Sequence, residues 1–355
     1  MSLLPDGRRE RFGRPSRRPE GGRIPVTVFT GYLGAGKTSI IRRLIETPEG
    51  RGSAVIVNEF GEIGLDQAFL ASGNESAILL GNGCLCCTVR TDLQQTLRTL
   101  FMQRSRGAAD FERVIIETSG LADPGPILQT FLSDRALAQE FHLRGLIAVA
   151  DPVTFSQSLE NDPVVRKQIA LADRIVVSKA DIAPADQTEA LVRLVGELAP
   201  ARPVAILGRD NLDPDFLLGE DLDLGARRSG FFADAGEHRD GVLSFPVIFD
   251  RPVPWDGFAQ AIRTLAQLRG RDLLRVKGLL AVEGCDGPVV IHAVQHLVHD
   301  PVELRTWPDA DHRSRLVFIT RGIHPEDIEA LFSVMVRLVN GRDRKLSGLP
   351  VSVSQ

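Results

Sequence analysis

The chain has 355 residues, of which 43% are hydrophobic and 25% are charged, and a formal net charge of −4. A length beyond the size at which one hydrophobic core usually stops growing predicts two domains. The composition of an ordinary soluble protein excludes a collagen, a coiled coil or a wholly disordered chain. The acidic balance argues against a nucleic-acid-binding protein, and no apolar run approaches the roughly 18 residues that a membrane-spanning helix needs.

The first 22 residues hold six Arg and three Pro and almost nothing to bury. This composition predicts a disordered basic tail rather than a secretory signal. Three of the four cysteines fall within four residues, a spacing unlike that of a disulfide framework. The sequence therefore predicts a cytoplasmic protein with reduced thiols.

From Arg23 onwards, short apolar segments alternate with helical ones. The expected strands are 24–29, 54–58, 113–117, 145–150, 174–178 and 204–207, and the expected helices are 37–47, 91–103, 126–132, 164–171 and 186–198. Strands that are apolar on both faces and separated by helices are typical of a parallel sheet covered by helices. Residues 23–207 are therefore predicted to form an α/β domain with a mostly parallel sheet.

Residues 208–241 are rich in Gly, Asp and Arg and are predicted to be an irregular connector. A second unit follows at 242–340, with strands expected at 242–249, 273–280, 289–297 and 314–320 and helices at 255–268 and 325–338. Two helices beside an antiparallel sheet make a smaller α+β domain. Residues 341–355 are predicted to be a polar tail.

A phosphate-binding loop is predicted in the segment GYLGAGKTS, which begins at Gly31 and matches G-x-x-x-x-G-K-[ST] between an expected strand and an expected helix. The residues expected to hold the phosphates are Gly34, Ala35, Gly36, Lys37, Thr38 and Ser39. The glycines let backbone N–H groups converge on phosphate oxygens at a helix N-terminus. Lys37 is expected to place its charge on the β- and γ-phosphates, and the Thr38 hydroxyl to bind Mg²⁺.

Guanine recognition is predicted at Ser178, Lys179 and Asp181, which match the [N/T/S]-K-x-D pattern of guanine-specific P-loop proteins. The Asp181 carboxylate can accept from two donors of guanine, a pair that adenine lacks, and the Lys179 stem can cover the base. Ser178 in place of Asn leaves part of the base discrimination open. GTP is therefore the expected nucleotide, and residues 23–207 are expected to be a P-loop GTPase domain.

A second switch is predicted where Glu117 ends an expected strand, three residues before Gly120. The Glu117 carboxylate is expected to hold Mg²⁺ through water, and the Gly120 N–H to meet the γ-phosphate. Asp66, in the segment 58–66 at the first-switch position, is a further candidate for Mg²⁺ or for positioning water. Catalysis is thus assigned to Lys37, Glu117 and Asp66.

A metal site is predicted at Cys84, Cys86 and Cys87, which lie in the segment GNGCLCCT. Thiols this close in sequence cannot pair comfortably in disulfides, whereas thiolates are good ligands for Zn²⁺, Co²⁺ or Cu(I). A tetrahedral site needs a further ligand from elsewhere, and Glu62 is the preferred donor. The alternative is that these are small buried thiols that only pack.

The segments 31–39, 58–66, 81–88, 117–124 and 178–181, in this order, resemble the motifs of the CobW-type GTPases, and among these the YjiA-like members. That family is a branch of the SIMIBI-class P-loop proteins that includes metallochaperones. The resemblance extends to about residue 335, through 275–278 and 316–321 of a CobW C-terminal domain. It implies GTP hydrolysis coupled to the handling of Zn²⁺ or Co²⁺ at the G-x-C-x-C-C segment. The basal rate of hydrolysis is expected to be slow, since the sequence shows no obvious arginine finger.

The expected function is that of a GTP-hydrolysing metallochaperone with a client metalloprotein or an enzyme of a cobalamin pathway as its partner. No specific nucleic acid and no membrane is expected as a partner, and a homodimer stays open. The alternative is a nucleotide-gated binding protein whose cysteine segment is structural or redox-active. A P-loop kinase is disfavoured by the guanine pattern. Whether His292, His296 and His299 bind metal also stays open, since they fit the polar face of a strand.

Overall fold

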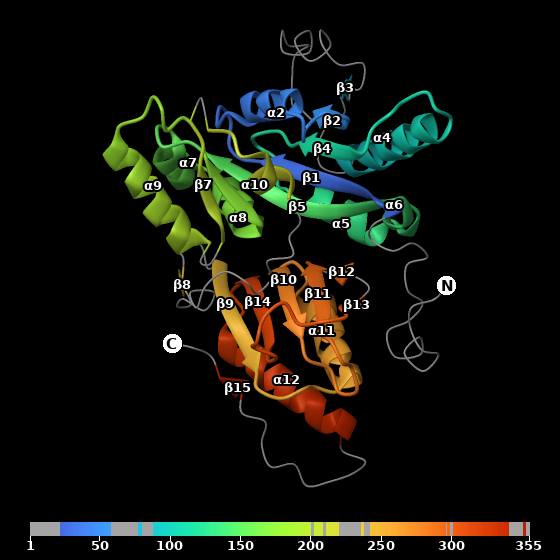
Figure 1. Cartoon of the computed structure of the whole chain (residues 1–355). Coiled ribbons are helices and arrows are strands. Elements are labelled where there is room, and N and C mark those ends of the chain that lie inside the picture. Colours follow the sequence, from blue (N-terminus) through green and yellow to red (C-terminus); the bar gives the residue numbers. More distant parts are fainter. Residues whose placement is uncertain are drawn as a thin grey trace. The chain divides into compact units, whose positions relative to one another are not determined.

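The structure is a computed structural model that describes residues 22–57, 77–79, 88–199, 202–208, 211–219, 236–237, 242–295, 297–298, 301–340 and 351–352. The chain folds into two compact units that divide after residue 221. In Figure 1 the first domain runs from blue to yellow and the second from orange to red. No helix in the described ranges is both long enough and apolar enough to cross a bilayer.

One parallel sheet forms the centre of the first domain, with its described strands in the order β3-β2-β4-β1-β5-β6-β7. The strands are β1 (Ile24–Thr30), β2 (Ser53–Val57), β3 (Ala77–Leu79), β4 (Arg113–Glu117), β5 (Phe141–Ala150), β6 (Arg174–Val177) and β7 (Val204–Ile206). The central strands consist mainly of buried Val, Ile and Ala, as strands covered on both faces require. Because all the strands are parallel, the loops that follow their carboxyl ends meet at one edge of the sheet.

Helices cover both faces of this sheet (Figure 1). They are α2 (Lys37–Glu46), α4 (Thr88–Ser105), α5 (Gly125–Ser133), α6 (Arg135–Glu140), α7 (Phe155–Asn161), α8 (Pro163–Leu171), α9 (Ala185–Leu198) and α10 (Pro214–Leu218). Successive residues of a strand point to opposite faces. Accordingly, Ile147 and Val149 of β5 pack in one cluster with α2 and α10, whereas Ala148 and Ala150 pack in another with α7, α8 and α9.

The second domain is built on an antiparallel sheet with the order β12-β11-β10-β14-β9-β15, in which β13 pairs with β11 and β8 with β9. Its described strands are β8 (Gly236–Glu237), β9 (Val242–Phe249), β10 (Leu273–Leu280), β11 (Val289–Val294), β12 (Leu297–Val298), β13 (Val302–Glu303), β14 (Ser314–Arg321) and β15 (Val351–Ser352). Two helices, α11 (Trp255–Arg269) and α12 (Pro325–Asn340), pack against each other beside this sheet.

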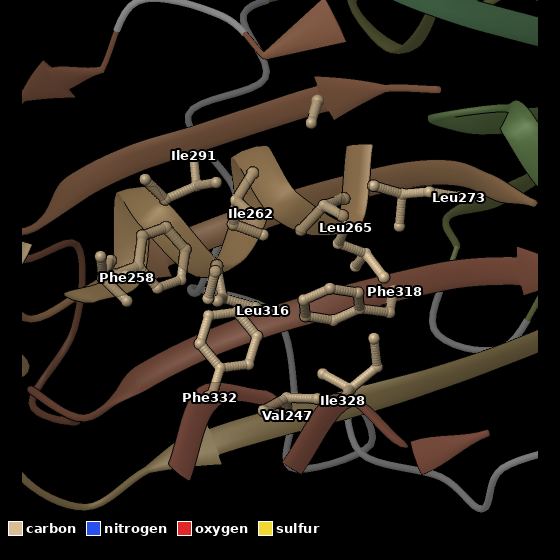
Figure 2. Packing of buried hydrophobic residues seen from close by; sticks show 14 of the residues in the cluster. Val247, Phe258, Ile262, Leu265, Leu273, Ile291, Leu316, Phe318, Ile328 and Phe332 are labelled. Carbon is tan, nitrogen blue, oxygen red and sulfur yellow. The ribbon is translucent and has the colours of Figure 1, made fainter. Parts of the chain in front are cut away.

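Buried aliphatic and aromatic side chains fill the core of the second domain, as Figure 2 shows. Phe258 of α11 and Phe332 of α12 stack with their ring centroids 5.2 Å apart. Phe249 of β9 meets the Phe332 ring edge-on at 5.4 Å, and Phe318 of β14 meets it at 6.2 Å. These contacts lock both helices onto one face of the sheet.

The predicted fold class is confirmed in both domains, and three predictions of local structure need correction. The strand predicted at 289–297 ends at Val294, because Gln295 adopts a φ of +54° and the chain turns back into β12. The predicted connector 208–241 contains α10, which Asp213 caps and Pro214 begins, and its Leu217 and Leu218 are buried in the first domain. The predicted tail 341–355 contains β15, which pairs with β9.

Candidate functional site

The phosphate-binding loop connects β1 to α2 at the carboxyl edge of the first sheet. Three of its glycines, Gly31, Gly34 and Gly36, have φ values of +140°, +74° and +91°, which L side chains rarely adopt. A Cβ added to Gly31 would also lie 2.2 Å from the Val149 carbonyl oxygen. The sequence pattern therefore corresponds to a backbone shape that needs glycine at these positions.

Lys37 begins α2 and turns its side chain back over the loop that precedes it. Its Nζ donates hydrogen bonds to the carbonyl oxygens of Gly31 at 2.8 Å and Tyr32 at 3.1 Å. The side chain is only 6% exposed. A buried ammonium held against the loop is placed to neutralise a phosphate group that enters it.

Thr38 and Glu117 meet although 79 positions separate them in sequence. The Thr38 hydroxyl donates to Glu117 Oε1 at 2.7 Å, and Glu117 is 6% exposed at the end of β4. Mg²⁺ prefers oxygen ligands and commonly binds through one or two protein oxygens together with substrate phosphates. A hydroxyl and a buried carboxylate beside a phosphate-binding loop fit that requirement.

The backbone of Gly120 lies directly on the phosphate-binding loop. A Cβ added to Gly120 would lie 2.5 Å from the Leu33 nitrogen and 2.7 Å from the Leu33 Cα, so no larger residue fits without displacing the loop. Just before it, the Thr118 N–H donates to the Phe29 carbonyl at 2.9 Å. The segment after β4, residues 118–124 (the second-switch segment), is thus in contact with the loop where phosphate would bind.

At the base end of the site, Ser178 links two segments of the protein. Its hydroxyl donates to the Ala35 carbonyl at 2.7 Å, with a second acceptor at Ala150 at 3.3 Å, and the residue is 4% exposed. The side chain therefore ties the segment after β6 to the phosphate-binding loop. This arrangement favours a positioning role for Ser178 over direct contact with a base.

Lys179 and Asp181 follow at the surface. Lys179 has a φ of +56°, and its Nζ lies 3.7 Å from Asp151 Oδ2. Asp181 is exposed, and a Cβ added to Gly208, in the turn after β7, would lie 3.7 Å from the Asp181 Cβ. The carboxylate predicted to read guanine is therefore accessible at the same edge of the sheet as the phosphate-binding loop.

Two parts of this site were not predicted from the sequence. Asp151, directly after β5, is 2% exposed, and its carboxylate accepts from the Val153 and Thr154 N–H groups at 3.1 and 3.0 Å and from the Thr154 hydroxyl at 2.6 Å. It thereby holds a fixed negative charge beside Lys179. The signal that could have revealed it is an acidic residue directly after a buried parallel strand. The turn at Gly208 carries no comparable signal.

Five predicted site residues, Glu62, Asp66, Cys84, Cys86 and Cys87, lie outside the described residues. The elements that flank them are described. Val57, which precedes segment 58–66, pairs in register with Glu117, and α4 begins at Thr88, directly after Cys87. Within the described ranges, no cluster of three or more His, Cys, Asp or Glu side chains could hold a metal ion.

The turn at Gln295 falls in sequence between His292 and the next two histidines, His296 and His299. His292 lies on β11, opposite Lys277 of β10, whereas His296 and His299 lie outside the described residues. Because β11 ends at Val294, His292 and His296 do not belong to one continuous strand. Cys285, the cysteine outside the predicted metal segment, packs against the core of the second domain.

Comparisons with known proteins agree with this geometry. Residues 25–205 match the family described as CobW/HypB/UreG, nucleotide-binding domain, and residues 242–336 match the cobalamin synthesis protein cobW C-terminal domain. The chain is 32% identical to the zinc chaperone YjiA of Escherichia coli (strain K12), over 87% of this chain and 98% of that protein. It is 31% identical to the zinc chaperone CobW of Pseudomonas aeruginosa, over 89% and 92%.

A solved structure extends the similarity to the fold. The crystal structure of the Zn(II)-bound YjiA GTPase from E. coli matches with a TM-score of 0.65 and 28% identity, over 88% of this chain and 99% of that one. Both family matches, the order of the motifs and the shared fold lead to one conclusion. The chain belongs to the CobW family, with a CobW/HypB/UreG nucleotide-binding domain followed by a CobW C-terminal domain.

Proposed function

We propose that this chain is a GTP-hydrolysing metallochaperone that binds zinc or cobalt at its cysteine segment and delivers the metal to a client protein. The observation that carries the proposal is the contact between Thr38 and Glu117, 2.7 Å apart, beside the buried Lys37. It joins the start of α2, directly after the phosphate-binding loop, to the end of β4, directly before the second-switch segment, and a nucleotide switch requires such a connection. The relatives named zinc chaperones support the choice of cargo.

In this proposal the phosphate end of the site performs the hydrolysis. Lys37 neutralises the charge that develops on the γ-phosphate, and Thr38 and Glu117 would hold Mg²⁺. The bound Mg²⁺ would supply further neutralisation of the phosphate charge. Asp66 is the remaining candidate for positioning the attacking water. Gly120, which rests on Leu33, would sense the γ-phosphate through its N–H.

The base end selects GTP. Asp181 accepts from guanine, and the Lys179 stem covers the base. Ser178 fixes both residues relative to the phosphate-binding loop through its 2.7 Å hydrogen bond to Ala35. Because adenine lacks the pair of donors that guanine presents to the Asp181 carboxylate, the site discriminates against ATP.

The metal would be held by Cys84, Cys86 and Cys87, with Glu62 as a further ligand. The segment that contains Glu62 leaves the sheet beside Glu117, and the cysteines directly precede α4. The segment that contains Glu62 therefore follows a strand that ends beside Glu117, a residue of the nucleotide site, which supports a nucleotide-dependent metal site. The client would be a metalloprotein or an enzyme of a cobalamin pathway, and a homodimer is compatible with the proposal.

The proposal is tested by following zinc during a single turnover. Protein loaded with zinc and GTP is mixed with a chromophoric chelator, and zinc transfer and phosphate release are recorded together. We expect transfer to follow hydrolysis, and a non-hydrolysable GTP analogue to retain the zinc. Cys86→Ser should abolish retention, whereas Cys285→Ser, in the second domain, serves as the matched control and should keep it. Zinc retention that depends on neither cysteine 86 nor nucleotide would contradict metal delivery and favour a structural or redox cysteine segment.

A further inference from the structure

Helix α8 holds the second-switch segment through two consecutive side chains. Gln168 is 1% exposed, and its Nε2 donates to the carbonyl oxygens of Gly120 at 3.0 Å and Ala122 at 3.2 Å. Next to it, Lys167 Nζ forms an ion pair with Asp123 Oδ2 at 2.6 Å. Helix α8 thus contacts this segment at Gly120, Ala122 and Asp123. Gly120 is the predicted sensor of the γ-phosphate.

Helix α8 is itself held in place by packing in the domain core and by a cap at its start. Val165 and Ile169 are each 1% exposed and pack in the core between the sheet and helices α7 to α9. Asp162 caps the start of the helix, accepting from the Val164 N–H at 2.9 Å. Beyond its end, the chain continues directly into β6 and Ser178. The element that holds the second-switch segment is therefore the element that leads to the base-recognition segment.

The amide oxygen of Gln168 takes no part in these hydrogen bonds. Gln168 Oε1 is buried and has no hydrogen-bond donor within the described part of the chain. A buried amide oxygen without a donor is unfavourable. The two hydrogen bonds that Gln168 Nε2 donates to Gly120 and Ala122 therefore have to offset this cost.

We propose that Gln168 is a positioning residue that sets how strongly the protein distinguishes GTP from GDP. By holding the Gly120 and Ala122 carbonyls, it keeps the Gly120 backbone on Leu33, where the N–H of residue 120 meets the γ-phosphate. The ion pair between Lys167 and Asp123 adds a second contact that holds the same segment. The inference rests on the proposed role of Gly120 as the γ-phosphate sensor.

A purely structural role for Gln168 makes a different prediction. If the amide only satisfied two buried carbonyl groups, its loss would weaken the fold and reduce the affinity for both nucleotides alike. A positioning role changes the ratio of the two affinities, because GDP has no γ-phosphate to be sensed. The ratio is therefore the quantity to measure.

The experiment compares Gln168→Met, which keeps the length of the side chain but cannot donate, with Ile169→Val as the matched control on the same helix. Affinities for a non-hydrolysable GTP analogue and for GDP are measured by fluorescence titration of the full chain with Mg²⁺. We expect Gln168→Met to reduce the analogue-to-GDP affinity ratio at least about fivefold, with GDP affinity nearly unchanged. Ile169→Val should leave the ratio unchanged. An unaltered ratio in folded Gln168→Met would overturn the proposal.

Two further variants keep the result interpretable. If Gln168→Met does not fold, Lys167→Ala removes the partly exposed ion pair instead, and an unaltered ratio there would equally overturn the proposal. Gly120→Ala places a Cβ against the Leu33 backbone and should collapse the ratio. If Gly120→Ala leaves the ratio unchanged, the proposed γ-phosphate sensor itself is wrong; if only the Gln168 and Lys167 variants leave it unchanged, the sensor stands and α8 does not control it.

Discussion

The two domains use buried polar side chains in different ways. In the first domain, Lys37, Glu117 and Asp151 are each at most 6% exposed and lie at the carboxyl edge of the parallel sheet, where the loops meet. In the second domain the core is an apolar and aromatic cluster. There the buried Arg315 is matched internally by Asp309, in a two-pronged ion pair with distances of 2.7 and 2.9 Å.

This difference separates function from support. Burying charged groups is costly unless they are paired, so a concentration of them at one edge of a sheet indicates a ligand site. An internally satisfied ion pair beside an aromatic core indicates a structural role. We therefore expect substitutions in the second-domain core to change stability and substitutions at the first-domain edge to change nucleotide chemistry.

The largest expected effect is on the stability of the second domain. Phe332→Ala removes a ring that is 1% exposed and contacts three other aromatic rings. It should lower the free energy of unfolding of this domain by about 3–5 kcal/mol. Urea unfolding followed by circular dichroism measures the loss, and Val334→Ala, at a 51% exposed position of the same helix, is the control. Loss of GTP binding while the second domain is still folded would contradict the separation of the two domains.

The next effect is on hydrolysis. Lys37→Ala removes the ammonium that is buried over the phosphate-binding loop, and the rate of phosphate release should fall at least a hundredfold, about 2.7 kcal/mol of barrier. The unfolding transition of the second domain should not move. Lys277→Ala removes a lysine from β10 of the second domain and is the control. Near-normal hydrolysis in Lys37→Ala would refute the catalytic interpretation of the loop.

A smaller effect is expected on the choice of base. The unaltered protein should bind GTP at least about tenfold more tightly than ATP, about 1.4 kcal/mol. Asp181→Ala should remove most of this preference, because the exposed carboxylate is the proposed acceptor for guanine. Asp186→Ala, an exposed position in the first turn of α9, should preserve it. Competition binding with a fluorescent nucleotide measures both, and equal affinity for GTP and ATP in the unaltered protein would refute guanine selection.

The sequence was sufficient where local pattern decides the structure. The bounds of β4, β9 and β10 were predicted correctly, since each is a short segment rich in apolar residues. The phosphate-binding loop was recognised because its glycines and Lys37 have a fixed spacing. The fold class followed from the alternation of such segments with helices.

The sequence was insufficient where distant residues meet or a residue adopts an unusual conformation. No local signal pairs Gln168 with Gly120, 48 positions away, or β15 with β9. Gln295 forms a left-handed turn without being glycine, so the strand was predicted too long. Asp151 was missed because it comes close to Lys179 only in the folded domain, where a separate strand brings Lys179 beside it.

We expect the nucleotide site and the proposed metal site to be energetically coupled. The most direct test is a zinc competition titration against a chromophoric chelator, with a non-hydrolysable GTP analogue or GDP bound, at a pH where the thiols ionise. Zinc should bind at least about fivefold more tightly in the analogue-bound state, about 1 kcal/mol, and zinc should favour the analogue over GDP by the same factor. Equal zinc affinity in both nucleotide states would contradict the account, because it would leave a GTPase and a metal site with no coupling between them.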